Sequence, residues 1–277
     1  MPFHYQGTTY LPPLGSHVDL GHPLATGLRM AFLANSPSPY DVVSGLLLST
    51  KGGNPRVGPG VSGLMLQLPQ TGDGYSTPCP VRFRHATLYS ICVRFAVTAP
   101  GYNPIPFAGV SSNANGTGGA CLMELHNVTQ TNIRMRTNKA GTLSLTEDAI
   151  VVPPKVPLVA VGTVNGTLGQ TILYCRGNIT DSGVGAAFTI SYTAPYVFFG
   201  LITGGTSSAN LQVQSLYLWP GTVLTPDQAM WLCEEPYAFW LPGRPKMKIS
   251  LPLALANLAG PLVNGPVLKS LVGGALA

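Results

Sequence analysis

Apolar and polar residues alternate along much of the chain in short runs that Gly, Pro and Asn separate. Residues 86–97 alternate most clearly: Ser90 and Arg94 fall on one face of the predicted strand, and the other face carries Tyr89, Ile91, Val93, Phe95 and Val97. The same period of two indicates short strands at residues 104–111, 120–125, 132–137, 187–192 and 197–202. The pattern therefore predicts a protein built mainly from β-strands.

Residues 157–178 predict a hairpin. Two apolar runs flank Asn165-Gly166, a dipeptide typical of a tight turn between antiparallel strands. In residues 132–137, Ile133 and Met135 alternate with two arginines, as in a strand with one buried face.

Residues 211–240 combine a strand and a short helix. Leu211, Val213, Tyr217 and Trp219 alternate with glutamines, which predicts one face on a core. Pro220-Gly221 ends the strand. Thr225 and Gln228 can form a capping box around Pro226 and Asp227, so we expect a helix near residues 226–235 that Pro236 closes.

The ending LYLWPGTVLTPDQAMWLCEEPYAFW resembles the closing strand and helix of laminin-G-like, concanavalin-A-like domains, in the form found in bacteriophage virion proteins. HPLATGL and YDVVSG near the start, GLMLQLPQTGDGY, and the hairpin containing YCRG are similar to further segments of that family, in the same order. Asp227-Gln228 replaces the family's usual acidic pair. The resemblance covers roughly residues 21–240.

This resemblance implies an all-β fold: an antiparallel two-sheet jelly-roll sandwich of the concanavalin-A type with one short helix. The expected organisation is an extended N-terminal arm at residues 1–21, the sandwich at residues 22–240, and an apolar, Pro- and Gly-rich C-terminal arm at residues 241–277.

Charged residues make up 9% of the chain, which also contains 33 glycines and 26 prolines. An isolated globular domain usually carries about a quarter charged residues, so this composition favours a surface partly covered by other chains. The net charge of +5 is spread thinly, and its densest group, Arg244, Lys246 and Lys248, is typical of a solvated flank. We therefore expect no nucleic-acid partner.

Five widely spaced cysteines, Cys79, Cys92, Cys121, Cys175 and Cys233, form no zinc pattern and indicate small core residues in a reduced compartment. The chain starts without the charged and apolar segments of a signal peptide. We expect synthesis in the cytoplasm of a host bacterium and no use of the glycosylation sequons.

Residues 249–277 are apolar, but Pro252, Pro261 and Pro266 interrupt them too often for a membrane-spanning helix. Apolar surface of this kind is expected to be buried. The preferred hypothesis is docking on other virion proteins or on copies of the chain, and the alternative is wrapping on the chain's own domain. The predicted docking residues are Trp240, Arg244, Lys246, Lys248, Leu251, Leu253 and Leu255.

No catalytic arrangement is predicted. The adjacent carboxylates Glu147-Asp148 and Glu234-Glu235 lack the spacing that related glycosidases need, so we expect no enzyme activity. Cys175 and His126 have no recognisable catalytic partner.

No cofactor or metal site is predicted either. His17, Asp19 and His22 are close in sequence, but the aperiodic segment favours a loop over a zinc site. Calcium is the alternative at Asp73 or Asp181, although an Asp in a turn usually accepts hydrogen bonds from its own backbone.

The expected function is that of a non-enzymatic bacteriophage structural protein, located in the virion and decorating the capsid or head surface. The alternative is a tail-associated adhesin that binds host or environmental glycans. Such an adhesin needs aromatic platforms, for which Tyr75, Tyr102 and Tyr196 lie near predicted turns.

Overall fold

The computed structural model divides the chain into two compact units, Met1–Gly243 and Arg244–Ala277. It describes residues 11–36, 40–51, 55–68, 73–78, 85–98, 105–111, 119–127, 131–139, 142–145, 150–183, 187, 190–191, 196–200 and 211–243. All of these lie in the first unit.

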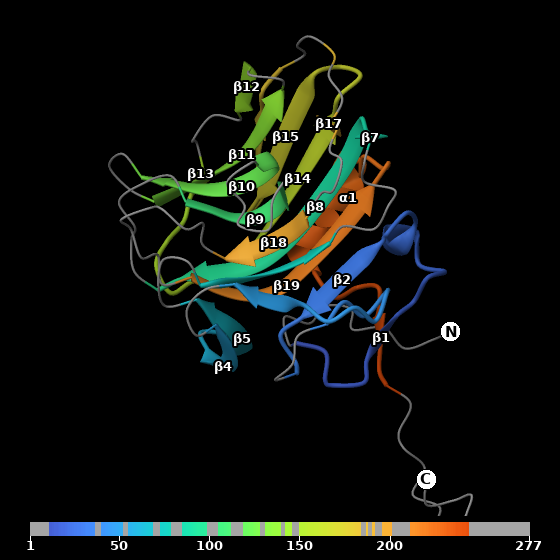
Figure 1. Cartoon of the computed structure of the whole chain (residues 1–277), viewed down its shortest axis with the longest axis vertical. Coiled ribbons are helices and arrows are strands. Elements are labelled where there is room, and N and C mark those ends of the chain that lie inside the picture. The colour runs from blue at the N-terminus through green and yellow to red at the C-terminus, as the bar shows by residue number, and fades with distance from the viewer. Residues whose placement is uncertain are drawn as a thin grey trace, which may run out of the picture. The chain divides into compact units, whose positions relative to one another are not determined.

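The first unit is a sandwich of two antiparallel sheets, shown in Figure 1. Sheet I contains, in spatial order, β12 (Thr142–Leu145), β11 (Thr131–Lys139), β10 (Gly119–Asn127), β9 (Ile105–Ser111), β18 (Tyr196–Gly200), β6 (Gly74–Pro78) and β3 (Ser49–Lys51), with β13 (Ile150–Val151) beside β11. Sheet II contains β16 (Asn178–Asp181), β15 (Gln170–Cys175), β14 (Leu158–Asn165), β8 (Leu88–Val97), β19 (Leu211–Pro220), β5 (Gly63–Leu68) and β4 (Arg56–Gly60), with β2 (Met30–Leu33) beside β19. The predicted all-β sandwich is confirmed.

Four short strands and two helices complete the described fold. β1 (His17–Val18) pairs with β20 (Trp240–Leu241), and β7 (His85–Ala86) pairs with β17 (Ile190–Ser191). The helices are the 3₁₀ turn η1 (Pro23–Ala25) and α1 (Pro226–Glu234). Within the expected N-terminal arm, residues 17–18 therefore pair with the segment that ends the sandwich, whereas residues 1–10 lie outside the described chain.

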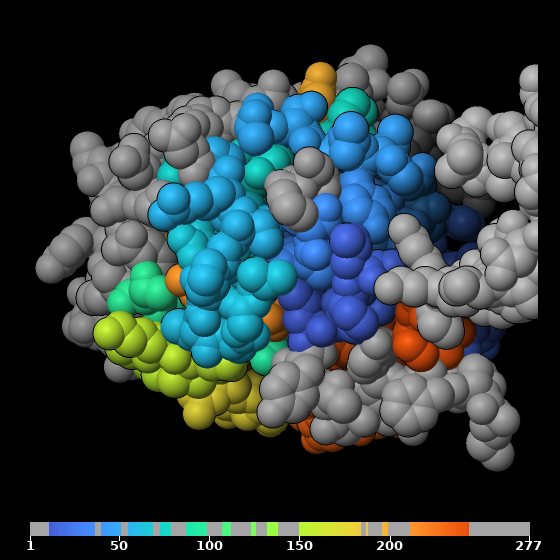
Figure 2. Space-filling view, turned by 90° about the horizontal axis from the view of Figure 1, so that it is seen from below, coloured from blue at the N-terminus to red at the C-terminus, as the bar shows by residue number. Residues whose placement is uncertain are grey.

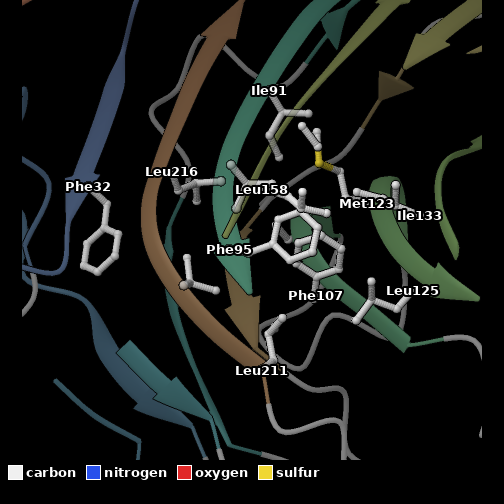
Figure 3. Close-up of a cluster of buried hydrophobic side chains, with 14 of the residues drawn as sticks. Phe32, Ile91, Phe95, Phe107, Met123, Leu125, Ile133, Leu158, Leu211 and Leu216 are labelled. Carbon is white, nitrogen blue, oxygen red and sulfur yellow. The ribbon is translucent and has the colours of Figure 1, made fainter. Parts of the chain in front are cut away.

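The inner core lies between the two sheets, where Phe95 of β8 packs on Phe107 of β9 with ring centroids 4.7 Å apart. Figure 3 shows these rings beside Met123, Leu125 and Ile133 from sheet I. The strand patterns at β8 and β11 are confirmed, because every apolar residue predicted to share a face belongs to this core.

A second core, called here the outer cluster, covers the opposite face of sheet II. It joins apolar residues of β8, β14 and β19 to α1, η1 and residues 237–240. Trp219 donates from Nε1 to the Leu24 carbonyl oxygen at 2.8 Å, which ties β19 to η1. Sheet II is thus buried on both faces where this cluster covers it.

The predicted single buried face of β19 is wrong. Leu211 and Val213 point into the inner core, whereas Tyr217 and Trp219 belong to the outer cluster. A register shift in the pairing with β8 lies between Val213 and Ser215. An extra residue at such a bulge reverses the alternation that follows it.

The predicted helix is confirmed at Pro226–Glu234 with its capping box. Thr225 Oγ1 accepts from the Gln228 amide at 3.2 Å, and Gln228 Oε1 accepts from the Thr225 amide at 3.0 Å. The hairpin of β14 and β15 is also confirmed, but Asn165 pairs directly with Gln170. Its loop is therefore Gly166–Gly169, and the left-handed residue is Gly169 (φ 63°).

Candidate functional site

Arg94 is the most unusual polar residue that the structure describes. It lies on β8, on the face that turns away from the inner core, and is only 4% exposed. Its guanidinium carbon lies 5.6 Å from the centroid of the Tyr237 ring, a distance that permits a cation–π interaction. Sheet II and the segment after α1 therefore hold a cation close to the outer cluster.

A hydrogen-bonded chain fixes the ring below Arg94. Tyr237 donates its hydroxyl proton to Gln214 Oε1 at 2.8 Å, and Gln214 Nε2 donates to the Ser62 carbonyl oxygen at 2.7 Å and to that of Leu64 at 3.2 Å. Gln214 is fully buried in β19 next to the bulge. Because its amide is fully engaged, the ring of Tyr237 and the β4–β5 turn are held in one arrangement.

Arg94 lines a pocket of about 560 Å³, called here the Arg94 pocket. Its wall is Ser62, Gly63, Val156, Pro157, Leu158, Val159, Arg176, Cys233, Glu234 and Pro236. The residues come from the β4–β5 turn with the first residue of β5, from residues 156–159 at the start of β14, from the β15–β16 turn, and from the end of α1 and the segment after it. In Figure 2 the β4–β5 hairpin (cyan) borders the segment near residues 150–160 (yellow-green).

Two turns that contain residues in the left-handed backbone conformation form the rim of the pocket. Arg176 (φ 52°) and Gly177 (φ 75°) link β15 to β16 as a two-residue turn, which suits the twist of paired strands. Gly63 (φ 95°) forms the opposite rim, where a side chain would strain the backbone. Arg176 is exposed, so its guanidinium is available to a bound molecule.

The pocket has a net positive charge. Among the described residues of the lining, Arg94 and Arg176 are cationic and Glu234 is the only carboxylate. In the part of the chain that the structure describes, no ion pair joins any of these three to another residue, and Arg94 Nε is buried without a hydrogen-bond partner. The end of α1 adds some negative potential from its free carbonyl groups.

The two titratable groups beside the pocket stay protonated at neutral pH. Burial raises the pKa of the Cys233 thiol to about 12, and nearby Cys175 and Glu234 add to the shift. Burial also raises the pKa of Tyr237, although Arg94 opposes that change. Neither of these two groups supplies a nucleophile or a general base near neutral pH.

A second charged group lies on sheet I. Glu124 is fully buried and accepts from Arg134 Nε at 2.8 Å and from Arg136 Nη1 at 2.7 Å. Glu124 and Arg134 are direct cross-strand neighbours on β10 and β11. Because the carboxylate of Glu124 pairs with both arginines within the sheet, we assign this group a structural role.

Trp240 is the only predicted docking residue that the structure describes. It is fully buried, stacks on Phe239 with centroids 6.0 Å apart, and donates from Nε1 to the Tyr217 hydroxyl at 3.2 Å. Its ring is therefore part of the domain's own packing. Arg244, Lys246, Lys248, Leu251, Leu253 and Leu255 lie outside the described residues, and docking through that tail stays a prediction.

The candidate zinc ligands of the N-terminal segment have separate local contacts. Asp19 accepts from the Gly21 amide at 3.0 Å, and His22 Nδ1 accepts from the Leu24 amide at 3.2 Å while its ring lies 5.1 Å from that of Trp231. No group of three potential metal ligands occurs among the described residues. Of the two candidate calcium ligands, Asp181 accepts a hydrogen bond from the Gly183 amide at 2.8 Å, and Asp73 is fully buried.

The other candidates are distributed as follows. Tyr75 is 4% exposed in the inner core, so it offers no platform, whereas Tyr196 is half-buried. Cys92 and Cys175 are buried as predicted, and Cys233 is a free, partly buried thiol. Tyr102, Glu147, Asp148, Cys79 and the side chains of Cys121 and His126 lie outside the described part. No described helix is long and apolar enough to cross a membrane.

Comparison with known proteins gives structural neighbours only; no family model and no curated protein sequence matches. The binding domain of Paraclostridial Mosquitocidal Protein 1 aligns with a TM-score of 0.58 and 14% identity over 75% of this chain and 52% of its own. Domain 4 of a GH43 extracellular arabinanase from Geobacillus stearothermophilus, in complex with arabinotriose, aligns with a TM-score of 0.55 and 15% identity, covering 74% and 98%.

The botulinum neurotoxin serotype D binding domain is a third neighbour, with a TM-score of 0.53 and 12% identity over 76% of this chain and 51% of its own. This chain thus spans about half the length of the mosquitocidal-protein and neurotoxin binding domains and nearly all of the arabinanase domain. At these identities the likeness shows a shared β-sandwich fold. The β-sandwich that the sequence predicts is thereby confirmed, whereas these three neighbours do not show the laminin-G-like family itself.

Proposed function

We propose that the chain is a non-enzymatic carbohydrate-binding module and that the Arg94 pocket is its binding site. The observation that carries the proposal is the pocket itself, because apolar walls with a few convergent polar groups are typical of small-molecule sites of this volume. The fold supports it: one neighbour is an arabinanase domain in complex with arabinotriose, and two are toxin binding domains. The comparisons therefore favour the predicted alternative, a glycan binder, over capsid decoration.

The pocket offers the contacts that a sugar ring needs. Val156, Pro157 and Pro236 present apolar surface to the C–H groups of a ring, while Arg176 and Glu234 can bond its hydroxyl groups. The raised pKa values of Cys233 and Tyr237 keep both groups protonated at neutral pH, and Glu234 is a single described carboxylate where glycoside hydrolysis needs a pair. Binding without hydrolysis is the expected outcome.

The test is a glycan array, covering neutral and acidic oligosaccharides, probed with the full chain. Val156 is 37% exposed on the pocket wall, so Val156→Trp blocks the pocket without changing its charge. Leu168→Trp, in the exposed β14–β15 loop, is the matched control. We expect binding by the wild type and the control and its loss in Val156→Trp. Absence of any glycan signal, or equal binding by Val156→Trp, contradicts the proposal, as does release of reducing ends.

Location in a virion is a separate proposal that rests on the sequence resemblance and the apolar tail. The neighbours provide no support for a capsid role. Gold-antibody labelling of purified particles tests it: labels over the head support decoration, labels at the tail tip support an adhesin, and unlabelled particles contradict both. Deletion of residues 241–277 should abolish loading onto particles if the tail docks there.

A further inference from the structure

We infer that the Arg94 pocket selects a sugar that bears one carboxylate, a hexuronic acid residue, through Arg94. This inference rests on the proposed function and assigns its ligand class. It starts from the 4% exposure of Arg94 and from its Nε, which is buried without a hydrogen-bond partner. A buried charge normally has a counterion, because removing it from water is costly.

The protein supplies only part of that compensation. The Tyr237 ring lies 5.6 Å from the guanidinium carbon and stabilises the cation through its face. Among the described residues, no carboxylate forms an ion pair with Arg94. The contrast with Arg134 and Arg136 is direct, since both contact Glu124 at 2.8 and 2.7 Å. Within the described fold, Arg94 thus has a cation–π contact with Tyr237 but no anionic partner.

The charge of the lining favours a monoanion. The described residues of the lining, two arginines and Glu234, sum to a charge of +1, which one carboxylate neutralises. A phosphate monoester carries close to two negative charges at neutral pH and would leave an excess next to Glu234. The planar fork of a guanidinium also matches a carboxylate in a two-bond geometry.

The walls favour a ring over a bare anion. Leu158 and Val159 of β14 and the prolines at 157 and 236 surround the charged groups with apolar surface. A free acetate ion would leave most of that surface in water, whereas the C–H face of a pyranose covers it. Carboxylate and ring together define a uronic acid as the ligand.

The experiment is calorimetric titration of the full chain with glucuronate, glucose, acetate and glucose 6-phosphate. We expect glucuronate to bind at least about tenfold more tightly than each of the other three ligands. One charge-assisted pair of hydrogen bonds can contribute a difference of this size. Arg94→Gln should remove this preference, and Arg94→Lys should restore it only in part because a lysine lacks the fork. Exposed Arg56→Gln on β4 is the control and should bind like the wild type.

Two further variants keep the test decisive if Arg94→Gln fails to fold. Arg176→Gln changes an exposed turn residue and should weaken glucuronate binding. Glu234→Gln raises the lining charge to +2 and should strengthen the binding of glucuronate and, more strongly, of glucose 6-phosphate. Unchanged affinity in both variants overturns the inference.

The ligand series separates this inference from the proposed function. Glucose binding equal to glucuronate binding overturns the carboxylate selection and leaves a glycan-binding pocket. Acetate binding equal to glucuronate binding overturns both, because the pocket then recognises a carboxylate without a sugar. A glucuronate preference that persists in folded Arg94→Gln shows that Arg94 is not the selecting residue.

Discussion

Single residues show two ways in which this sandwich stabilises a buried arginine. Arg134 and Arg136 share the carboxylate of Glu124, whereas Arg94 lies over the Tyr237 ring and faces a pocket. In the first arrangement both cations have a carboxylate partner within the sheet, although Arg136 Nε, like Arg94 Nε, is buried without a hydrogen-bond partner. In the second arrangement the cation can still bind an anion from outside the protein. We therefore assign a structural role to Arg134 and Arg136 and a candidate functional role to Arg94.

Glu124→Gln should therefore destabilise the domain. The change keeps the side-chain shape but removes the carboxylate that two partly buried guanidinium groups contact, and we expect a loss of about 3 kcal/mol in the free energy of unfolding. Urea denaturation measures it, with exposed Arg56→Gln as the control. A loss no larger than that of the control would show that the ion pairs contribute little.

Cys233 should alkylate slowly although it lines the pocket. Its pKa of about 12 leaves roughly one thiol in ten thousand ionised at pH 8, against about a tenth of thiols at the ordinary pKa of 9.0. Peptide-resolved mass spectrometry after iodoacetamide treatment compares native and urea-unfolded protein. We expect modification of Cys233 only after unfolding, and rapid native modification at pH 8 would show that its thiol is not shielded.

At the scale of elements, the sequence predicts those parts whose signal is local. The alternation in β8 and β11 and the capping box of α1 depend on neighbouring residues, so their patterns appear directly in the chain. The two buried faces of β19 cannot be read from its pattern in the same way, because the bulge near Gln214 changes the alternation and both faces are buried. The hairpin at β14 and β15 was predictable, but its loop was not.

The candidate site is harder to predict than the elements. Arg94 stands out in the sequence as a charge on a strand face that otherwise carries Ser90, Cys92 and Ala96, and that signal could have marked it. Its pocket joins four segments that are far apart in the sequence. Short patterns contain no information about such long-range contacts, which is why Arg176 and Glu234 had no predicted site role.

Thr225→Ala isolates the contribution of the α1 cap. Thr225 is exposed, so the change removes the bond to the Gln228 amide without opening a cavity. We expect a loss of about 1 kcal/mol in the free energy of unfolding. Exposed Thr167→Ala, in the β14–β15 loop, is the matched control and should stay within about 0.5 kcal/mol of wild type. Thermal and urea unfolding measure both variants. Equal losses of stability for Thr225→Ala and Thr167→Ala would mean that the cap is dispensable.

At the scale of the whole molecule, sheet II is the shared wall of two apolar cores. The inner core contains Cys175 and the outer cluster contains Cys92, and both thiols are fully buried. Burial raises the pKa of Cys175 to about 12 and that of Cys92 well above its ordinary value. The free energy of unfolding of this unit should therefore depend on pH in the alkaline range.

The Cys175 thiol should lower stability as pH rises above about 9. Below its unfolded pKa of 9.0 the thiol is protonated in both states, so it adds no pH dependence. Between pH 9 and 12 the unfolded thiol loses its proton while the folded one keeps it, and the free energy of unfolding should fall by up to about 1.4 kcal/mol per pH unit. Urea denaturation of wild type and Cys175→Ala at pH 8 to 11 isolates this contribution, since the difference between their curves should shrink with pH. Val164→Ala, also in the inner core, removes no titratable group and should give a constant difference; a constant difference for Cys175→Ala as well would show that its thiol titrates alike in both states.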